Sequence, residues 1–119
     1  MLVSTKFGCS ISHDGKCIYS IGGIGLSGTL NNAEAYNVTE NKWYQLPNMV
    51  QARFWSVAVV FQSKYLYTFC GCYDDPSEGH ISNVDTTERL NIGDGIYNTT
   101  KWEQLLIKGI PQSNMYHIA

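Results

Sequence analysis

The sequence predicts an all-β protein in which two four-stranded antiparallel meanders follow one another along a chain of 119 residues. Apolar runs of strand length alternate with turn-forming Gly, Asn, Asp and Ser residues. No apolar pattern keeps the period of an amphipathic helix. One order of residues occurs twice, which indicates a repeated supersecondary unit.

The two copies of this unit align with few gaps. Tyr19 and Trp43 recur 48 and 59 residues later as Tyr67 and Trp102. The spacing grows only in the loop after the glycines and in the turn before the tryptophan, as expected when insertions are confined to loops. We assign the first unit to residues 4–47, the second to residues 51–107 and the start of a third to residues 112–119.

The first unit is expected to form strands at residues 7–12, 17–21, 33–38 and 43–46. Asp14-Gly15 suits a hairpin turn, because glycine readily adopts the positive φ that such turns require. Gly22-Gly23 ends the second strand and permits a close backbone approach that a side chain would prevent. Pro47 ends the fourth strand, since it has no amide hydrogen to donate to a sheet.

The second unit is expected to form strands at residues 55–61, 65–69, 88–92 and 102–107. The first of these is continuously apolar, which favours a strand buried on both faces. We therefore expect residues 55–61 and 65–69 to be the most buried strands. Cys70-Gly71 takes the place of the double glycine.

A single sheet of this kind cannot bury both of its faces. Radial stacking, as in a β-propeller, buries one sheet against the next. Tyr36 and Trp43 lie on the outer strands, where large rings can fill the widening space between sheets. Leu90 takes the place of Tyr36 in the second unit.

These features resemble the kelch repeat, which has a period of about 50 residues. The resemblance covers nearly the whole chain and is carried by Gly22, Gly23, Tyr36, Trp43, Gly71 and Trp102. Cys70 and Leu90 depart from the kelch pattern, so how closely the second bend copies the first stays open. The resemblance implies propeller blades, and it gives these six residues a structural role.

Two blades and the start of a third are too few to close a propeller, which in kelch proteins usually has about five to seven blades. Two explanations are open. The chain is part of a longer protein, or several copies assemble. The first is favoured here, because the chain stops within an expected strand at Ala119.

Composition excludes several classes of function. Eight Lys and Arg residues against ten Asp and Glu residues give a net charge of −2, and no basic run suggests nucleic-acid binding. No apolar stretch approaches the roughly 20 residues of a membrane span. The first residues lack the features of a signal peptide. We therefore expect a cytoplasmic protein with four reduced cysteines.

Neither a cofactor nor enzymatic activity is expected. Cys70 and Cys72 form one close pair, with no second pair or nearby histidine at metal-ligand spacing. His13, His80 and His117 lie in three different segments. Copper oxidases also carry kelch-type blades, but the paired tyrosines and histidines that their site needs are not evident here.

One edge of the two sheets is the expected binding site. In a meander, loops alternate between the two edges, so residues 24–32, 48–53, 72–87 and 108–114 share one edge. The turns at residues 13–16 and 39–42 lie on the other edge. Long loops on a rigid scaffold commonly bind partners. We therefore expect a protein partner at the first edge.

The candidate contact residues on this edge are Arg53, Lys6, Asp74, Asp75, Glu78 and His80. Similar kelch domains often carry an arginine just before the innermost strand, where Arg53 stands, and Lys6 has the matching place in the first unit. The alternative is that Arg53 caps the strand and stays in solvent. Asp74-Asp75 could equally be a solvated turn.

The kelch resemblance implies a protein–protein interaction module. Such modules include the substrate-recruiting part of ubiquitin-ligase adaptors and scaffolds associated with the cytoskeleton. A purely architectural role in a larger assembly is the alternative, because a fold by itself does not define a function.

Overall fold

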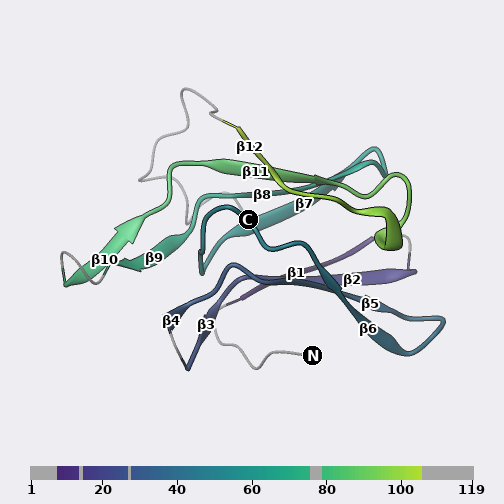
Figure 1. Ribbon diagram of the computed structural model, residues 1–119, viewed down its shortest axis with the longest axis horizontal. Coiled ribbons are helices and arrows are strands. Elements are labelled where there is room, and N and C mark those ends of the chain that lie inside the picture. Colours follow the sequence, from purple (N-terminus) through teal and green to yellow (C-terminus); the bar gives the residue numbers. More distant parts are fainter. Residues whose placement is uncertain (1–7, 14, 27, 76–78, 106–119) are drawn as a thin grey trace.

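The computed structural model describes residues 8–13, 15–26, 28–75 and 79–105. Within these ranges the chain forms two four-stranded sheets, two short hairpins and one 3-10 turn, Ile96–Asn98, and no α-helix. In Figure 1 the second sheet lies above the first. The prediction of an all-β chain made of two antiparallel meanders is confirmed.

The first sheet has the strand order β1-β2-β5-β6. Its strands are β1 (Cys9–His13), β2 (Cys17–Ile21), β5 (Ala33–Asn37) and β6 (Lys42–Leu46). Tyr19 lies opposite Ile11 on one side and opposite Ala35 on the other. β2 has the predicted bounds, and the bounds of β5 and β6 differ from the predicted ones by a single residue.

The second sheet has the strand order β12-β11-β8-β7, the same meander. Its strands are β7 (Val57–Phe61), β8 (Tyr65–Phe69), β11 (Thr87–Asn91) and β12 (Glu103–Leu105). Tyr67 lies opposite Val59 and Arg89, as Tyr19 lies opposite Ile11 and Ala35. The internal repeat therefore extends to the register of the strands. Residues 106–107 of the predicted last strand lie outside the described residues.

The double glycine makes the bend that ends β2. Gly22 and Gly23 have φ values of 62° and 109°, and a Cβ on Gly22 would lie 2.3 Å from the carbonyl oxygen of Arg53. Cys70 and Gly71 have φ values of 61° and 98°. The second bend thus copies the first, although Cys70 must adopt a left-handed conformation that L-residues other than glycine rarely accept.

Two short hairpins were missed by the sequence prediction, which treated both segments as loops. They are β3 (Ile24–Gly25) with β4 (Gly28–Thr29), and β9 (Cys72–Asp75) with β10 (His80–Asn83). Both hairpins follow the bends just described, and Figure 1 shows them at the same end of the molecule. Each hairpin forms a separate two-stranded sheet.

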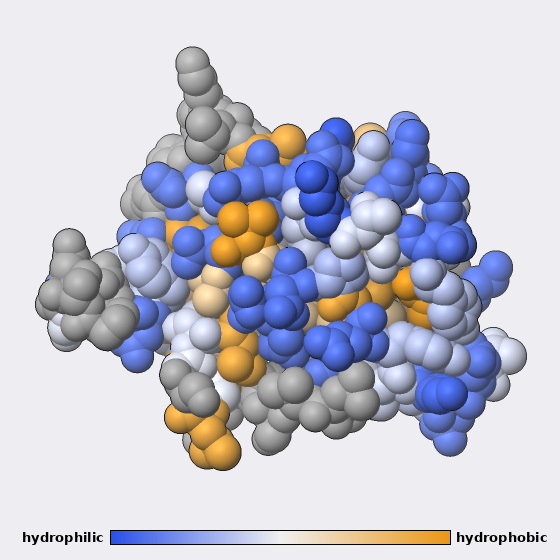
Figure 2. All heavy atoms as spheres, viewed as in Figure 1, coloured by the Kyte–Doolittle hydropathy of each residue, from blue (hydrophilic) through white to orange (hydrophobic). Residues whose placement is uncertain are grey.

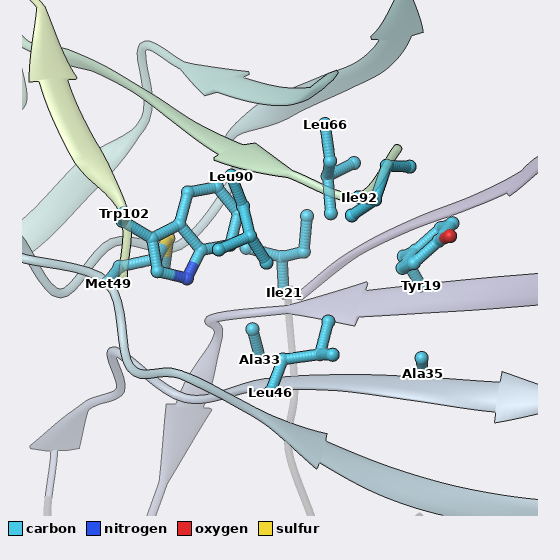
Figure 3. Packing of buried hydrophobic residues seen from close by; sticks show 10 residues of the cluster. All are labelled: Tyr19, Ile21, Ala33, Ala35, Leu46, Met49, Leu66, Leu90, Ile92 and Trp102. Atoms are coloured by element: carbon cyan, nitrogen blue, oxygen red, sulfur yellow. The ribbon is translucent and has the colours of Figure 1, made fainter. Parts of the chain in front are cut away.

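The main core fills the space between the two sheets. Figure 3 shows Ile21 of the first sheet directed at Leu66 and Leu90 of the second. The buried residues of this cluster are Tyr19, Ile21, Ala33, Ala35, Leu46, Met49, Leu66, Leu90, Ile92 and Trp102. Each large side chain buried here contributes about 1.5–3 kcal/mol to stability. The sheets therefore stabilise each other, as the stacking argument predicts.

Trp102 shows how an aromatic residue of the outer region joins two sheets. Its indole is 3 % exposed, and its Nε1 donates to the carbonyl oxygen of Pro47 at the end of the first sheet, at 2.7 Å. Trp43 occupies the same place in the first unit but is only half-buried, and its ring packs against Tyr36 at 5.2 Å. Trp102 thus fills the space between the two sheets, the role that was expected for Tyr36 and Trp43, which are not part of this core cluster.

The prediction that residues 55–61 and 65–69 are the most buried strands is wrong. No residue of β7 is fully buried, and Val59 and Phe61 are exposed. Ala58 and Val60 pack against the core, whereas the alternate residues of β7 face away from the first sheet. The continuous apolar run therefore reflects a second apolar face that the described residues leave exposed. β5 and β11 contain more buried residues.

Candidate functional site

The predicted loop edge is held together by the segment that connects the two sheets, residues 47–56. The backbone of Arg53 forms hydrogen bonds with residues on either side of the first hairpin. Its carbonyl oxygen accepts from Gly23 N at 2.9 Å, and its amide donates to Leu30 O at 3.1 Å. Phe54 exchanges two backbone hydrogen bonds with Cys72 of the second hairpin, both at 2.8 Å. The described loops therefore share one edge, as predicted, while residues 108–114 lie outside the described residues.

The two hairpins also contact each other directly. The amide of Asp74 in β9 donates to Thr29 Oγ1 in β4 at 2.9 Å. This bond joins a hairpin of the first sheet to one of the second without the help of the connecting segment. The loop edge is thus a continuous surface built from both sheets.

A buried ion pair lies beneath this surface. Arg53 Nη2 is 2.8 Å from Glu88 Oε2, and both side chains are 0 % exposed. Arg53 Nη1 also donates to the carbonyl oxygen of Thr86 at 2.8 Å and to that of Cys70 at 3.3 Å. Burial lowers the pKa of Arg53, and the hydrogen bond and charge of Glu88 oppose that shift.

Glu88 is the centre of this network. Its carboxylate accepts from the amides of Val50 at 2.6 Å and Gln51 at 2.8 Å, in addition to Arg53. A buried carboxylate is tolerated when it is paired and fully hydrogen-bonded. Because Glu88 lies on β11, it fastens the connecting segment to the second sheet.

The structure corrects the predicted exposure of Arg53. Both the partner-binding interpretation and the alternative of a solvated strand cap place its side chain in solvent, whereas it is fully buried. Its contacts give it a structural role in the edge. The sequence could not indicate this, because Glu88 lies 35 residues further along the chain.

The other candidate residues are distributed unevenly. Asp74 is exposed on β9, Asp75 ends that strand, and His80 is exposed at the start of β10 with its Nδ1 3.2 Å from the carbonyl oxygen of Ile81. The structure thus brings these three together on one hairpin. Lys6 and Glu78 lie outside the described residues.

Sequence reasoning missed the exposed apolar residues of the same edge. Leu26, between β3 and β4, is fully exposed, and Ile81 on β10 is 56 % exposed. The corner of the molecule where the first hairpin ends is orange in Figure 2. In the sequence, Leu26 and Ile81 are each the single large apolar residue of a short segment of small or polar residues. These segments are Gly-Leu-Ser-Gly and His-Ile-Ser.

The opposite edge carries a second contact between the sheets. The hydroxyl of Tyr97, in the 3-10 turn, donates to Glu40 Oε1 in the turn between β5 and β6. Tyr44 donates to Glu40 Oε2 at 2.8 Å, and its ring meets that of Tyr97 edge to face at 4.9 Å. The hydrogen bonds from Tyr97 and Tyr44 lower the pKa of Glu40, and Tyr97 and Glu40 raise the pKa of Tyr44.

No disulfide joins the cysteines of the described residues. Cys70 and Cys72 are buried with Phe54, and burial raises the pKa of Cys70 while the nearby Arg53 charge opposes the shift. Within the described ranges, no three His, Cys, Asp or Glu side chains are grouped so that they could hold a metal ion. In the same part of the chain, no helix is long and apolar enough to cross a membrane.

A comparison with protein families finds a match over the first sheet. A family model described as the Kelch motif matches residues 6–50, which include β1 to β6 and the start of the connecting segment. No curated protein matches the chain.

Proposed function

We propose that this chain, whose residues 6–50 match the Kelch motif, acts as a non-enzymatic protein-interaction module whose loop edge contacts the partner. The observation that carries the proposal is the pairing of a rigid base with exposed apolar side chains. The base is the connecting segment bonded to both hairpins and to Glu88. Leu26 and Ile81 stand on that base in solvent.

Pre-organisation supports this choice of edge. A binding surface that is already ordered loses little conformational entropy when a partner binds. The second hairpin is bonded to Phe54 of the connecting segment through Cys72, and to the first hairpin through the Asp74–Thr29 hydrogen bond. Burial of such large apolar side chains by a partner favours association.

The partner that fits this edge is a protein segment with apolar side chains between polar or basic ones. Leu26 and Ile81 offer apolar contacts, while Asp74 and Asp85 are exposed carboxylates on or beside the second hairpin. Charges of opposite sign on the partner would favour the correct orientation. Recruitment of a ligase substrate and cytoskeletal scaffolding are both compatible with such contacts.

The test uses a library of random peptides displayed on phage, selected on the immobilised 119-residue chain. Replacing Leu26 and Ile81 together by Ser is expected to weaken binding of the selected peptides at least about tenfold, the loss typical of central interface residues. The control is Val38→Ser, since Val38 is 45 % exposed and its amide is bonded to Lys16 O at the opposite edge.

Two outcomes would contradict the proposal. One is that no peptide is enriched over the uncoated surface. The other is that the Val38 control loses as much binding as the double variant, because the edge would then have no special role.

An architectural role is the second candidate. The observation that favours it is the exposure of apolar residues on the outward sheet faces, with Val59 at 42 % and Phe61 at 54 %. Such residues suit a contact with another sheet better than a contact with a flexible peptide.

A further inference from the structure

Each of the two sheets has one face in the core and one face directed away from the other sheet. Side chains alternate along a strand, so the core residues identify the outward ones. The large apolar residues of the leading face of the first sheet are Ile18, Tyr36 and Trp43, which lie side by side on neighbouring strands. The trailing face of the second sheet includes Val59, Phe61, Tyr67, Phe69 and Arg89.

Both faces present apolar surface to solvent. Ile18 is 36 % exposed on the leading face, and Val59 and Phe61 are more exposed on the trailing face. Contiguous apolar residues across several strands indicate an interaction surface, unlike single exposed residues.

The packed contact between the two sheets is the seam of the molecule. It shows which residues form a close contact between two sheets of this kind. Leu66, Leu90 and Trp102 are three of the residues with which the second sheet packs on the first, and Ala58 and Val60 of β7 also pack there. By the internal repeat, Ile18, Tyr36 and Trp43 stand at these same three positions in the first sheet. The leading face therefore repeats these three positions of the surface that docks within the chain, while Ser10 and Ser12 stand where the second sheet has Ala58 and Val60.

The trailing face repeats the other half of that seam. Ile11, Tyr19 and Ile21 receive the second sheet within the chain. Their counterparts in the second sheet are Val59, Tyr67 and Phe69. One copy of the chain thus carries both halves of a contact of the kind that already holds its own sheets together.

Some residues of the outward faces differ from their counterparts in the seam, and these differences are compatible with such a contact. Leu90 is directed at Ile21 across the seam in Figure 3. The counterparts of this pair on the outward faces are Tyr36 and Phe69, and two aromatic rings pack favourably at such a position.

Arg89 does not prevent docking on the trailing face. Its guanidinium lies 4.2 Å from the centre of the Tyr65 ring and is 3.3 Å from Glu103 Oε1. The charge is therefore already paired within the second sheet. An arginine stacked in this way presents its flat surface and methylene groups for packing.

We propose that the leading face of one copy docks on the trailing face of a second copy, so that the chain assembles head to tail. The contact continues the stacking seen between its own two sheets. It is heterologous, which leaves one free face at each end to receive a further copy. The loop edge takes no part in it.

The first test measures the mass of the purified 119-residue chain by light scattering during gel filtration at several concentrations. The expected mass exceeds that of one copy and rises with concentration. Ile18→Asp on the leading face and Val59→Asp on the trailing face are each expected to weaken self-association at least about tenfold, because each buries a charge in an apolar contact. Ile81→Asp is the matched control, since it places the same charge on an exposed isoleucine of the hairpin, and it should associate like the unmodified chain.

Mixing the two variants gives the sharper test. The Ile18→Asp copy keeps an intact trailing face, and the Val59→Asp copy keeps an intact leading face. The mixture is expected to form a one-to-one dimer and nothing larger, although each variant alone is monomeric.

Three results would overturn the proposal: a monomer at all concentrations of the unmodified chain, single variants that keep the full mass, or a mixture that stays monomeric. Circular dichroism must show that both variants retain their strands. Should either Asp variant unfold, Ile18→Ser and Val59→Ser repeat the mixing test with a smaller perturbation.

Discussion

Arg53 and Glu88 are the residues on which the loop edge depends most. Both are buried completely, and between them they bond to Val50, Gln51 and Thr86. Removing one partner of a buried pair leaves the other charge without compensation, which costs far more than the pair contributes when intact. Their hydrogen bonds join the connecting segment, the loop before β11 and β11 itself.

Arg53→Met should therefore lower the free energy of unfolding by about 3–5 kcal/mol, as is typical when a buried ion pair loses one member. Urea unfolding followed by circular dichroism measures this loss. The control is Arg89→Met, because the Arg89–Glu103 pair has side chains that are 28 % and 50 % exposed. An exposed pair contributes at most about 1 kcal/mol. Equal losses in the two variants would show that burial of the Arg53 pair has no energetic consequence.

At the scale of secondary-structure elements, the insertion before Trp102 has a clear structural role. It lengthens the turn between β11 and β12 and forms the 3-10 turn Ile96–Asn98. Tyr97 on this turn reaches the first sheet, where it contacts Glu40 and Tyr44. The insertion thus holds the two sheets together at the edge opposite the hairpins.

This contact makes part of the stability depend on pH. Hydrogen bonds from Tyr97 and Tyr44 lower the pKa of Glu40 in the folded chain. A carboxyl group whose pKa is lowered by folding stabilises the fold above its unfolded pKa, about 4.3 for glutamate, and that stabilisation is lost as the pH falls through the lower folded value.

Glu40→Gln is therefore expected to lower the melting temperature at pH 7 and to have a smaller effect below about pH 4. Thermal unfolding at a series of pH values measures the difference. In a Tyr97→Phe background the effect of Glu40→Gln at pH 7 should shrink, since the main hydrogen-bond donor is gone. A difference between the two chains that stays constant from pH 7 to the acid range would refute this explanation.

At the scale of the whole molecule, the seam between the sheets makes one structural unit out of two repeats. Trp102 lies in that seam and donates a hydrogen bond to Pro47 across it. Trp43, its counterpart in the first unit, has no second sheet of the described chain on its side. The internal repeat thus offers two tryptophans with the same place in the sheet and different environments.

Trp102→Ala should cost about 3–5 kcal/mol, the loss typical of a large buried aromatic residue. Trp43→Ala should cost clearly less, because Trp43 is only half-buried. Urea unfolding followed by circular dichroism measures both losses. If the Trp43 variant lost as much stability as the Trp102 variant, the seam would not be the main source of stability.

The sequence by itself determined the strands and the repeat. β2 and β8 have their predicted bounds because short apolar runs end at glycines and polar turns, which are local signals. The sequence also predicted that Gly22 forms a backbone bend, because a double glycine after a strand indicates one. The kelch resemblance followed from the same residues.

Only the tertiary structure decided the burial of Arg53, the two hairpins and the uncovered faces. Arg53 is buried because Glu88, on a distant strand, compensates its charge. β3 is only two residues long and β9 ends in two aspartates, so neither shows an alternating apolar pattern, and the connecting segment forms hydrogen bonds beside both. An apolar run such as that of β7 shows that both faces avoid water, but only the arrangement of the sheets shows that one face is covered by this chain and the other is not.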